Sequence, residues 1–140
     1  MAKIICIASD METQTNTICT EKLEKDSLVQ LQRLIGCNTV SCHTITLDGM
    51  EYDVWYDDNY MGKNKSLTWV DFEGGDDNPT VLCGNIVFAH CDSKSNTVGI
   101  NLGELLLFPD MYTRHMESAM KKFIPWYKNI RKNAGYEDMN

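Results

Sequence analysis

The stretch TVSCHTITLDGMEYDVWY, residues 39–56, decides the fold of this chain. Its two arms, residues 39–47 and 50–56, are rich in β-branched and aromatic side chains. They flank Asp48 and Gly49, and Asp-Gly between two such runs is the strongest short signal for a β-hairpin. Apolar and polar residues alternate in the second arm, which is the period of a strand. The stretch therefore predicts two antiparallel strands joined by a tight turn.

A short helix precedes this hairpin. Ser27 offers an N-cap, and Gln30 three residues later completes a capping-box pattern. Gly36 stands where a left-handed C-cap belongs. Four apolar residues between the caps recur at helical spacing: Leu28, Leu31, Leu34 and Ile35. The pattern predicts a helix over residues 28–35.

Further strands are predicted on both sides of this unit. Isoleucine-rich residues 3–8 form a first strand, and the polar residues 9–26 form a loop or a weak hairpin. After the hairpin, the predicted strands are residues 67–72, 81–89 and 98–100. The expected fold is α+β, an antiparallel β-meander of four to six strands with a helix across one face.

The C-terminal region, residues 101–140, is predicted to be helical. Pro109 suits the first turn of a helix, and Pro125 is expected to kink it near Ile124, with a second segment ending at Gly135. One apolar stripe runs through both segments and is expected to face the core: Tyr112, Met116, Ala119, Met120, Phe123, Tyr127 and Ile130. Residues 1–140 are thus expected to form a single domain, mostly β up to residue 100.

Composition is that of a globular protein. The chain has 140 residues, of which 43% are hydrophobic and 24% charged, enough to bury a core in one domain. No run of about 18 apolar residues occurs, so no membrane partner is expected. The apolar run at residues 4–8 is too short for a signal peptide. We therefore expect a cytoplasmic protein, and no motif indicates a cofactor.

Charge is distributed unevenly. The net charge is −7, yet residues 114–132 hold six basic side chains and one acid, a local balance of +5. Residues 48–77 hold nine acids and two lysines. An acidic body with one basic segment argues against duplex DNA, which requires a broad basic face. It is compatible with one anionic ligand at the C-terminal segment.

Six cysteines raise the question of a metal site. Two of them stand beside a histidine, in Cys37, Cys42 and His43, but no C-x2-C pair of the kind typical of zinc is present. Cys42 and His43 are neighbours on a predicted strand and point to opposite faces. A nucleophilic cysteine needs a general base beside it, and the sequence pattern identifies none. We expect structural thiols; the alternatives are a zinc site that includes Cys83, His90 or Cys91, and redox chemistry.

The same region carries a family resemblance. The segments LVQLQRLIG, ITLDGMEYDVWYDDNYMG and VLCGNIVFA resemble the phage and mobile-element family described as domain of unknown function 3846. The resemblance covers about residues 27–90 and leaves out the C-terminal basic segment. It implies a phage or prophage origin, in the cytoplasm of an infected bacterium, and a small α+β fold. It implies no catalytic residues.

A binding protein for a nucleotide-type second messenger is the favoured function. A small phage protein that sequesters such a signal counters host defence, and it needs aromatic faces for bases and cations for phosphates. The candidate ligand-binding residues are Trp55, Tyr56, Tyr60, Trp69, Arg114, Lys121, Lys122, Lys128 and Arg131. We expect no catalysis and a homodimer or higher oligomer, with the apolar face of the C-terminal helices as its seam.

Two other functions stay open. The carboxylates of residues 48–77 can present a negative surface to a host nucleic-acid enzyme, which makes the protein an acidic inhibitor. A small phosphodiesterase or hydrolase is the third possibility, although the adjacent carboxylates Asp57 and Asp58 lie at a predicted turn, where such pairs usually only keep the loop in water. No phosphate loop followed by a lysine is present.

Overall fold

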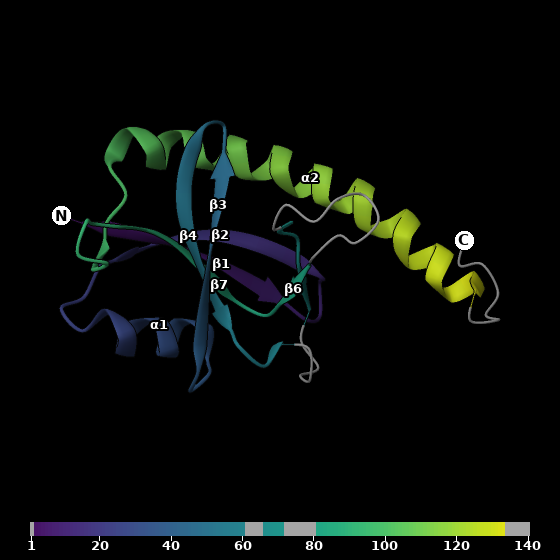
Figure 1. The fold of residues 1–140 in the computed structure, drawn as a ribbon, viewed down its shortest axis with the longest axis horizontal. Helices are drawn as coiled ribbons and strands as arrows, with labels where there is room; N and C mark the ends of the chain where they lie inside the picture. The colour runs from purple at the N-terminus through teal and green to yellow at the C-terminus, as the bar shows by residue number, and fades with distance from the viewer. Residues whose placement is uncertain (1, 61–65, 72–80, 134–140) are drawn as a thin grey trace.

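The computed structural model describes residues 2–60, 66–71 and 81–133, without the side chains of 126, 127 and 129–133. An antiparallel sheet carries the short helix α1 (Ser27–Ile35) on one face and the long helix α2 (Leu102–Asn133) on the other (Figure 1). The predicted α+β class is confirmed. Neither helix has an apolar stretch long enough to cross a membrane within the part of the chain described.

The sheet has six strands, all paired antiparallel. They are β1 (Lys3–Asp10), β2 (Thr15–Lys22), β3 (Val40–Leu47), β4 (Met50–Asp57), β7 (Ile86–Cys91) and β8 (Thr97–Val98). The order across the sheet is β2-β1-β7-β4-β3, and β8 pairs with the end of β7. A separate two-stranded sheet joins β5 (Leu67–Thr68) to β6 (Leu82–Cys83).

This strand order corrects the predicted meander. β7 lies between β1 and β4, so strands adjacent in sequence are not all adjacent in space. The physical reason is burial: four consecutive β7 residues, Ile86 to Ala89, are fully buried, as expected for a central strand covered on both faces. Gly84, in the left-handed region at φ 84°, divides the predicted strand 81–89 into β6 and β7.

The polar residues after β1 form a full strand rather than a loop or weak hairpin. β2 pairs with β1 through eight residue pairs, from Lys3 with Lys22 to Asp10 with Thr15. β2 lies at the edge of the sheet, where much of each residue faces water, so its sequence needs few apolar side chains. Hydrophobic periodicity therefore gave too weak a signal to locate it.

Helix α1 begins one residue before its predicted range of 28–35, ends where predicted and differs in its N-cap. The side chain of Asp26, not that of Ser27, accepts the Val29 N–H at 3.2 Å. Gln30 does not close a capping box, because its buried amide accepts the Glu24 N–H at 2.8 Å and donates to the Lys22 carbonyl at 2.7 Å. At the other end Gly36 has φ 79°, which confirms the left-handed C-cap.

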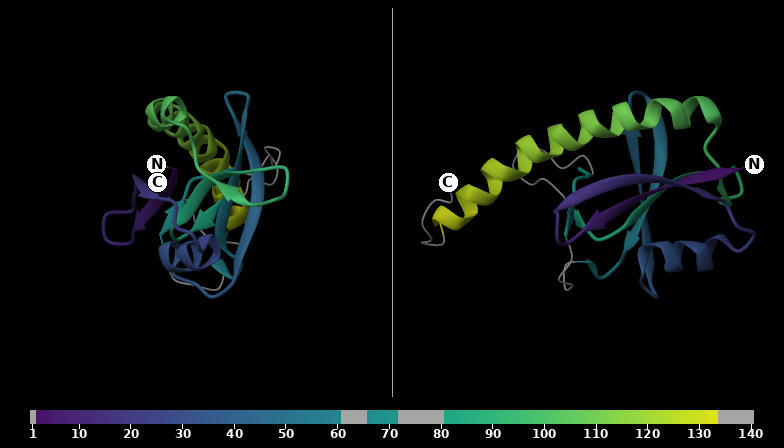
Figure 2. Two further views of the ribbon diagram at one scale, coloured as in Figure 1. Left: turned by 90° about the vertical axis from the view of Figure 1, so that its left-hand side faces the viewer. Right: turned by 180° about the vertical axis from the view of Figure 1, so that it is seen from behind.

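Helix α2 begins seven residues before its predicted start. Asn101 caps it by accepting the Glu104 N–H at 2.9 Å, a signal that the sequence interpretation missed. Pro109 and Pro125 both lie inside one continuous helix, which corrects the predicted break near Ile124. The C-terminal half of α2 runs past the end of the sheet (Figure 2). The predicted end at Gly135 lies outside the described residues.

Two cores lie on either side of the sheet. The α2 side is built from edge-to-face aromatic rings, among them Tyr52, Phe88, Phe108 and Tyr112. The α1 side is aliphatic: Ile4, Cys6, Leu31, Ile35, Val87 and Ala89. From the predicted core stripe of α2, Tyr112 and Ala119 are buried. The side chains of Tyr127 and Ile130 lie outside the description.

Candidate functional site

The nine predicted ligand-binding residues do not meet in one place. Trp55 packs with the core on the α1 face, whereas Tyr56 and Tyr60 pack against the core on the α2 face. The rings of Tyr56 and Tyr60 contact each other edge to face, with centroids 5.9 Å apart. The sheet therefore lies between Trp55 and the residues of α2.

The remaining aromatic candidate, Trp69, packs directly on α2. Its ring centroid lies 5.5 Å from that of Phe123, edge to face, and its backbone N–H donates to the Asn16 side chain. Trp69 is thus part of the contact that fixes the segment around β5 to the long helix.

A buried polar cluster lies beside this contact. Lys122 Nζ is 3.0 Å from Asp71 Oδ2, and the Asp71 N–H donates to His115 Nε2 at 3.1 Å. The side chain of Asp71 is only 6% exposed. Burial lowers the pKa of His115, so the imidazole is neutral at neutral pH and accepts this bond. Lys122 is therefore engaged in the protein's own ion pair.

The other basic candidates differ in their surroundings. Arg114 pairs with Asp48 at 2.7 Å and lies 3.6 Å from Asp110. Lys121 and Lys128 are exposed on α2, and the side chain of Arg131 lies outside the description. Two of the cations expected to bind phosphate, Arg114 and Lys122, are thus already neutralised by carboxylates.

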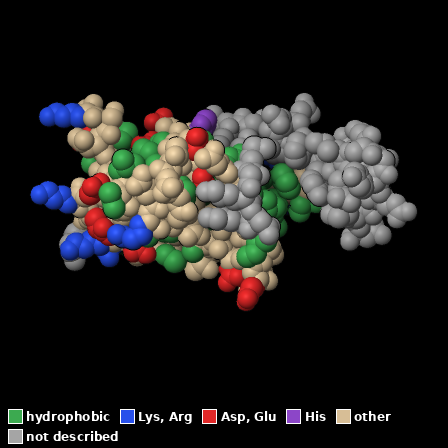
Figure 3. Space-filling view, turned by 90° about the horizontal axis from the view of Figure 1, so that it is seen from below, with side chains coloured by type: hydrophobic (Ala, Val, Ile, Leu, Met, Phe, Trp, Pro, Cys, Tyr) green, Lys and Arg blue, Asp and Glu red, His purple; other side chains and the backbone are tan. Residues whose placement is uncertain are grey.

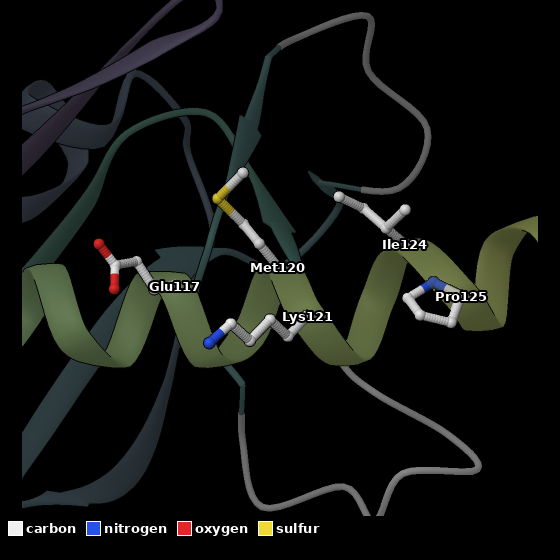
Figure 4. Close-up of a pocket in the computed structure, with 5 residues that line it drawn as sticks. All are labelled: Glu117, Met120, Lys121, Ile124 and Pro125. Carbon is white, nitrogen blue, oxygen red and sulfur yellow. The ribbon is translucent and has the colours of Figure 1, made fainter. Parts of the chain in front are cut away.

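An apolar groove of about 470 Å³ lies on the C-terminal half of α2. Met120, Ile124 and Pro125 form most of its described lining, and Glu117 and Lys121 border it (Figure 4). Figure 4 shows the Lys121 side chain extending along the helix in the direction of Glu117. The described lining contains no aromatic ring. This groove suits an aliphatic partner better than a nucleobase.

A second hollow, of about 420 Å³, lies on the α1 face and includes Trp55. It forms where the start of α1, the turn before β8 and the middle of β4 meet. Its lining consists of Glu24, Lys25, Ser27, Leu28, Leu31, Trp55, Ser95, Asn96 and Thr97. An indole and two leucines thus stand beside hydroxyl, amide and ammonium groups.

Lys25 is the cation that the α1 hollow offers to an anion, and the carboxylate of the neighbouring N-cap residue Asp26 offsets part of its charge. The Glu24 carboxylate is bound by both guanidinium nitrogens of Arg33, which hold its pKa below the ordinary value. Lys25 has no such partner among the described residues. Figure 3 shows Lys and Arg side chains, with Asp and Glu side chains between them, at the end of this face where α1 begins.

Backbone N–H groups at the start of α1 provide further donors for an anion. Asp26 caps the Val29 N–H, and its carbonyl accepts the Gln30 N–H at 3.1 Å. The N–H groups of Ser27 and Leu28, in the first turn, have no helical partner, as at the start of any helix. Anions bind favourably at such N–H groups because the helix dipole is positive there.

The turn on the other side of the hollow is rigidly built. Asp92 Oδ1 accepts the N–H groups of Lys94 and Asn96, each at 2.9 Å. These bonds, that of Asn96 first, lower the pKa of Asp92. The turn thereby holds Ser95 and Asn96 at the wall of the hollow, opposite α1.

Trp55 has one further feature. Its indole N–H is buried and makes no hydrogen bond with any described residue. The sequence interpretation found Trp55 and missed Lys25, Ser27 and Asn96, because residues 24–31 and 95–97 meet only through the pairing of β7 with β8. In the sequence, residues 92–96 (DSKSN) were recognisable only as a turn.

The cysteines form no metal site in the parts of the chain that the structure describes. All six are free, and no group of three His, Cys, Asp or Glu side chains is placed to hold an ion among those residues. Burial raises the pKa of both Cys6 and Cys42 to about 12, with Cys19 and Asp53 as the next contributions. These two thiols are therefore protonated and weakly nucleophilic.

Several carboxylates of the predicted acidic face turn inward. Asp57 is 3% exposed and accepts the Asn59 N–H at 2.9 Å, and Asp71 is bound to Lys122. Asp48 pairs with Arg114. The acids at 73, 76 and 77 lie outside the described residues. The described part of residues 48–77 therefore presents less negative charge than the sequence suggests.

Comparison with protein-family models, with curated proteins and with solved structures finds no match to this chain.

Proposed function

We propose that the protein binds a phosphate-bearing nucleotide in the α1 hollow, non-covalently and without turning it over. The observation that supports this most directly is the composition of the hollow: Trp55, Lys25 and the first turn of α1 line one space of about 420 Å³. Pockets for small ligands usually measure about 300–1,000 Å³ and combine apolar walls with a few polar groups.

The base is held by the apolar wall. Trp55 provides a stacking face, and Leu28 and Leu31 lie beside it. Stacking of a base on an aromatic side chain contributes about 1–3 kcal/mol. Asn96 and Ser95 supply amide and hydroxyl groups that can bond the edge of the base or the ribose.

The phosphate is held at the helix terminus. Lys25 donates from its ammonium group, and the N–H groups of Ser27 and Leu28 donate from the backbone. Hydrogen bonds to a charged group contribute about 1.5–3 kcal/mol each. These three bonds and one stacked base sum to about 5.5–12 kcal/mol, so a micromolar dissociation constant corresponds to the upper end of this range once an ordering cost of about 4 kcal/mol is subtracted.

The lining of the hollow supports sequestration rather than catalysis. The described residues around the hollow include no histidine or cysteine, and their one carboxylate, Glu24, is bound to Arg33. No group there is poised to activate water or the ligand. This composition favours a role as a sink for a nucleotide signal.

Calorimetry with cyclic di- and trinucleotides, cyclic ADP-ribose isomers and mononucleotides tests the proposal. The wild-type protein is expected to bind at least one of them with one site per chain. Trp55→Leu removes the stacking face and is expected to weaken binding about tenfold or more, while Trp55→Phe retains much of it. Lys25→Gln is expected to weaken binding about tenfold.

Two controls make the test specific. Lys121→Gln and Arg114→Gln alter the cations on the opposite face of the sheet and are expected to leave the affinity unchanged. If these variants lose binding and Lys25→Gln does not, the ligand lies on α2 and the α1 hollow is the wrong site. Absence of heat with every ligand, or recovery of a cleaved product, contradicts the proposed function itself.

A further inference from the structure

One flank of α2 carries a continuous apolar stripe. Residues that are 4, 7, 11, 18 and 22 positions apart lie on the same side of an α-helix. From Leu102 this spacing selects Leu106, Pro109, Thr113, Met120 and Ile124, a set we call the flank stripe. Leu102 and Leu106 are 70% and 74% exposed, and Ile124 is 41% exposed. Side chains this apolar rarely stay in water over so long a row.

The flank stripe is separate from the core-facing side of α2. Phe108, Tyr112 and Ala119 face the sheet and are buried. At about 100° per residue, Leu102 and Leu106 lie roughly a third of a turn around the helix from that row. A partner on the stripe therefore lies beside α2, where the sheet of this chain does not block it.

The four aliphatic members of the flank stripe lie symmetrically about Thr113. Leu102 and Ile124 each lie eleven residues from Thr113, and Leu106 and Met120 each lie seven residues from it. An antiparallel copy of the same helix, centred at Thr113, thus brings Leu102 level with Ile124 and Leu106 level with Met120, while Pro109 comes level with Glu117. This is the self-complementarity that a twofold interface requires.

The two ends of the flank stripe differ in shape. The two leucines project at the N-terminal end, and the groove of about 470 Å³ at Met120, Ile124 and Pro125 lies at the C-terminal end. In the antiparallel arrangement the leucines of each copy enter the groove of the other. The hydroxyl of Thr113 already donates to the Pro109 carbonyl at 2.8 Å, so it leaves no free donor at the centre.

Charge is compatible with this pairing. A row of two acids and two bases borders the flank stripe on its solvent side: Asp110, Arg114, Glu117 and Lys121. Under the twofold, the rows of the two copies lie on the same side of the contact, and Asp110 of one copy is within one helical turn of both Arg114 and Glu117 of the other. The two rows together are neutral.

We propose that a second copy of this chain covers the flank stripe, with the two α2 helices antiparallel and the twofold axis at Thr113. The contact is about 33 Å long and one helix wide, which is small for a stable interface, so the dissociation constant is expected in the micromolar range. The stripe and the α1 hollow lie on opposite faces of the sheet. Loss of the dimer and loss of ligand binding are therefore separate outcomes.

Sedimentation equilibrium of the full chain tests the proposal. The wild type is expected to change from the 16.0 kDa monomer to a dimer across micromolar concentrations. Leu106→Glu places a charge in the seam, level with Met120 of the other copy, and is expected to leave only monomer. Leu107→Glu is the matched control, because Leu107 is 63% exposed yet lies off the stripe, and it is expected to dimerise as the wild type does.

Cross-linking tests the register. Thr113→Cys brings two thiols together at the twofold and is expected to form a covalent dimer under mild oxidation, whereas Leu107→Cys is not. A wild type that stays monomeric, or a dimer that both glutamate variants disrupt equally or neither disrupts, overturns the proposal. So does cross-linking at Leu107→Cys without cross-linking at Thr113→Cys.

Discussion

Two lysines that are adjacent in the sequence have different surroundings in the fold and therefore different roles. Lys121 and Lys122 were predicted to have the same role, as cations for a phosphate. In the fold Lys122 is bound to Asp71, whose side chain is 6% exposed, and Lys121 borders the groove on the other side of the helix. Nothing in the sequence near residue 122 separates the two, because Asp71 lies 51 residues away.

Removal of the Lys122 charge is expected to destabilise the fold. In Lys122→Met the Asp71 carboxylate stays buried without its counter-ion, and breaking such a pair costs about 3–5 kcal/mol. Because the Lys122 side chain is 35% exposed, we expect a loss near 3 kcal/mol in the free energy of unfolding, measured by urea denaturation. Lys121→Met, the control, is expected to change it by less than about 0.5 kcal/mol. Equal stabilities of the two variants would contradict this role of Asp71.

Among the elements, those whose ends are marked by turn or cap residues in the sequence were predicted well. The Asp48-Gly49 turn joins β3 to β4 with both residues at positive φ, and Gly36 ends α1 in the left-handed region. β2 and the start of α2 were missed or misplaced. β2 is an edge strand of polar residues, and Asn101 caps α2 eight residues ahead of the more conspicuous Pro109. Tertiary packing can stabilise a helix that contains a proline, so neither Pro109 nor Pro125 marks an end of α2.

The N-cap of α1 provides a direct test at this scale. Asp26 accepts the Val29 N–H, so Asp26→Ala is expected to lower the free energy of unfolding by about 1 kcal/mol. Ser27, which the sequence pattern favoured as the cap, lies inside the helix, and Ser27→Ala is expected to be close to neutral. Thermal unfolding by circular dichroism measures both. A larger loss for Ser27→Ala than for Asp26→Ala would mean that the helix starts one residue later.

For the whole molecule, the sequence predicted the class of fold and only part of the site. Trp55 was identified as a candidate because it is an aromatic residue on a strand. Its neighbours in the α1 hollow come from residues 24–31 and 95–97, which the insertion of β7 at the centre of the sheet and its pairing with β8 bring together. The basic stretch after residue 114 was conspicuous in the sequence, yet the sheet separates it from Trp55. Local patterns carry no information about such long-range pairing.

The central claim is that a nucleotide binds at Trp55, and Trp55 fluorescence measures this most directly. The chain has three tryptophans, so Trp69→Phe and Trp126→Phe together leave Trp55 as the only indole. Titration of this variant with the nucleotide that calorimetry selects is expected to quench the emission saturably, at one ligand per chain. Lys25→Gln in the same background is expected to shift the midpoint to about tenfold higher concentration. Emission that stays constant while calorimetry still records binding would contradict the account, because the ligand would then lie elsewhere.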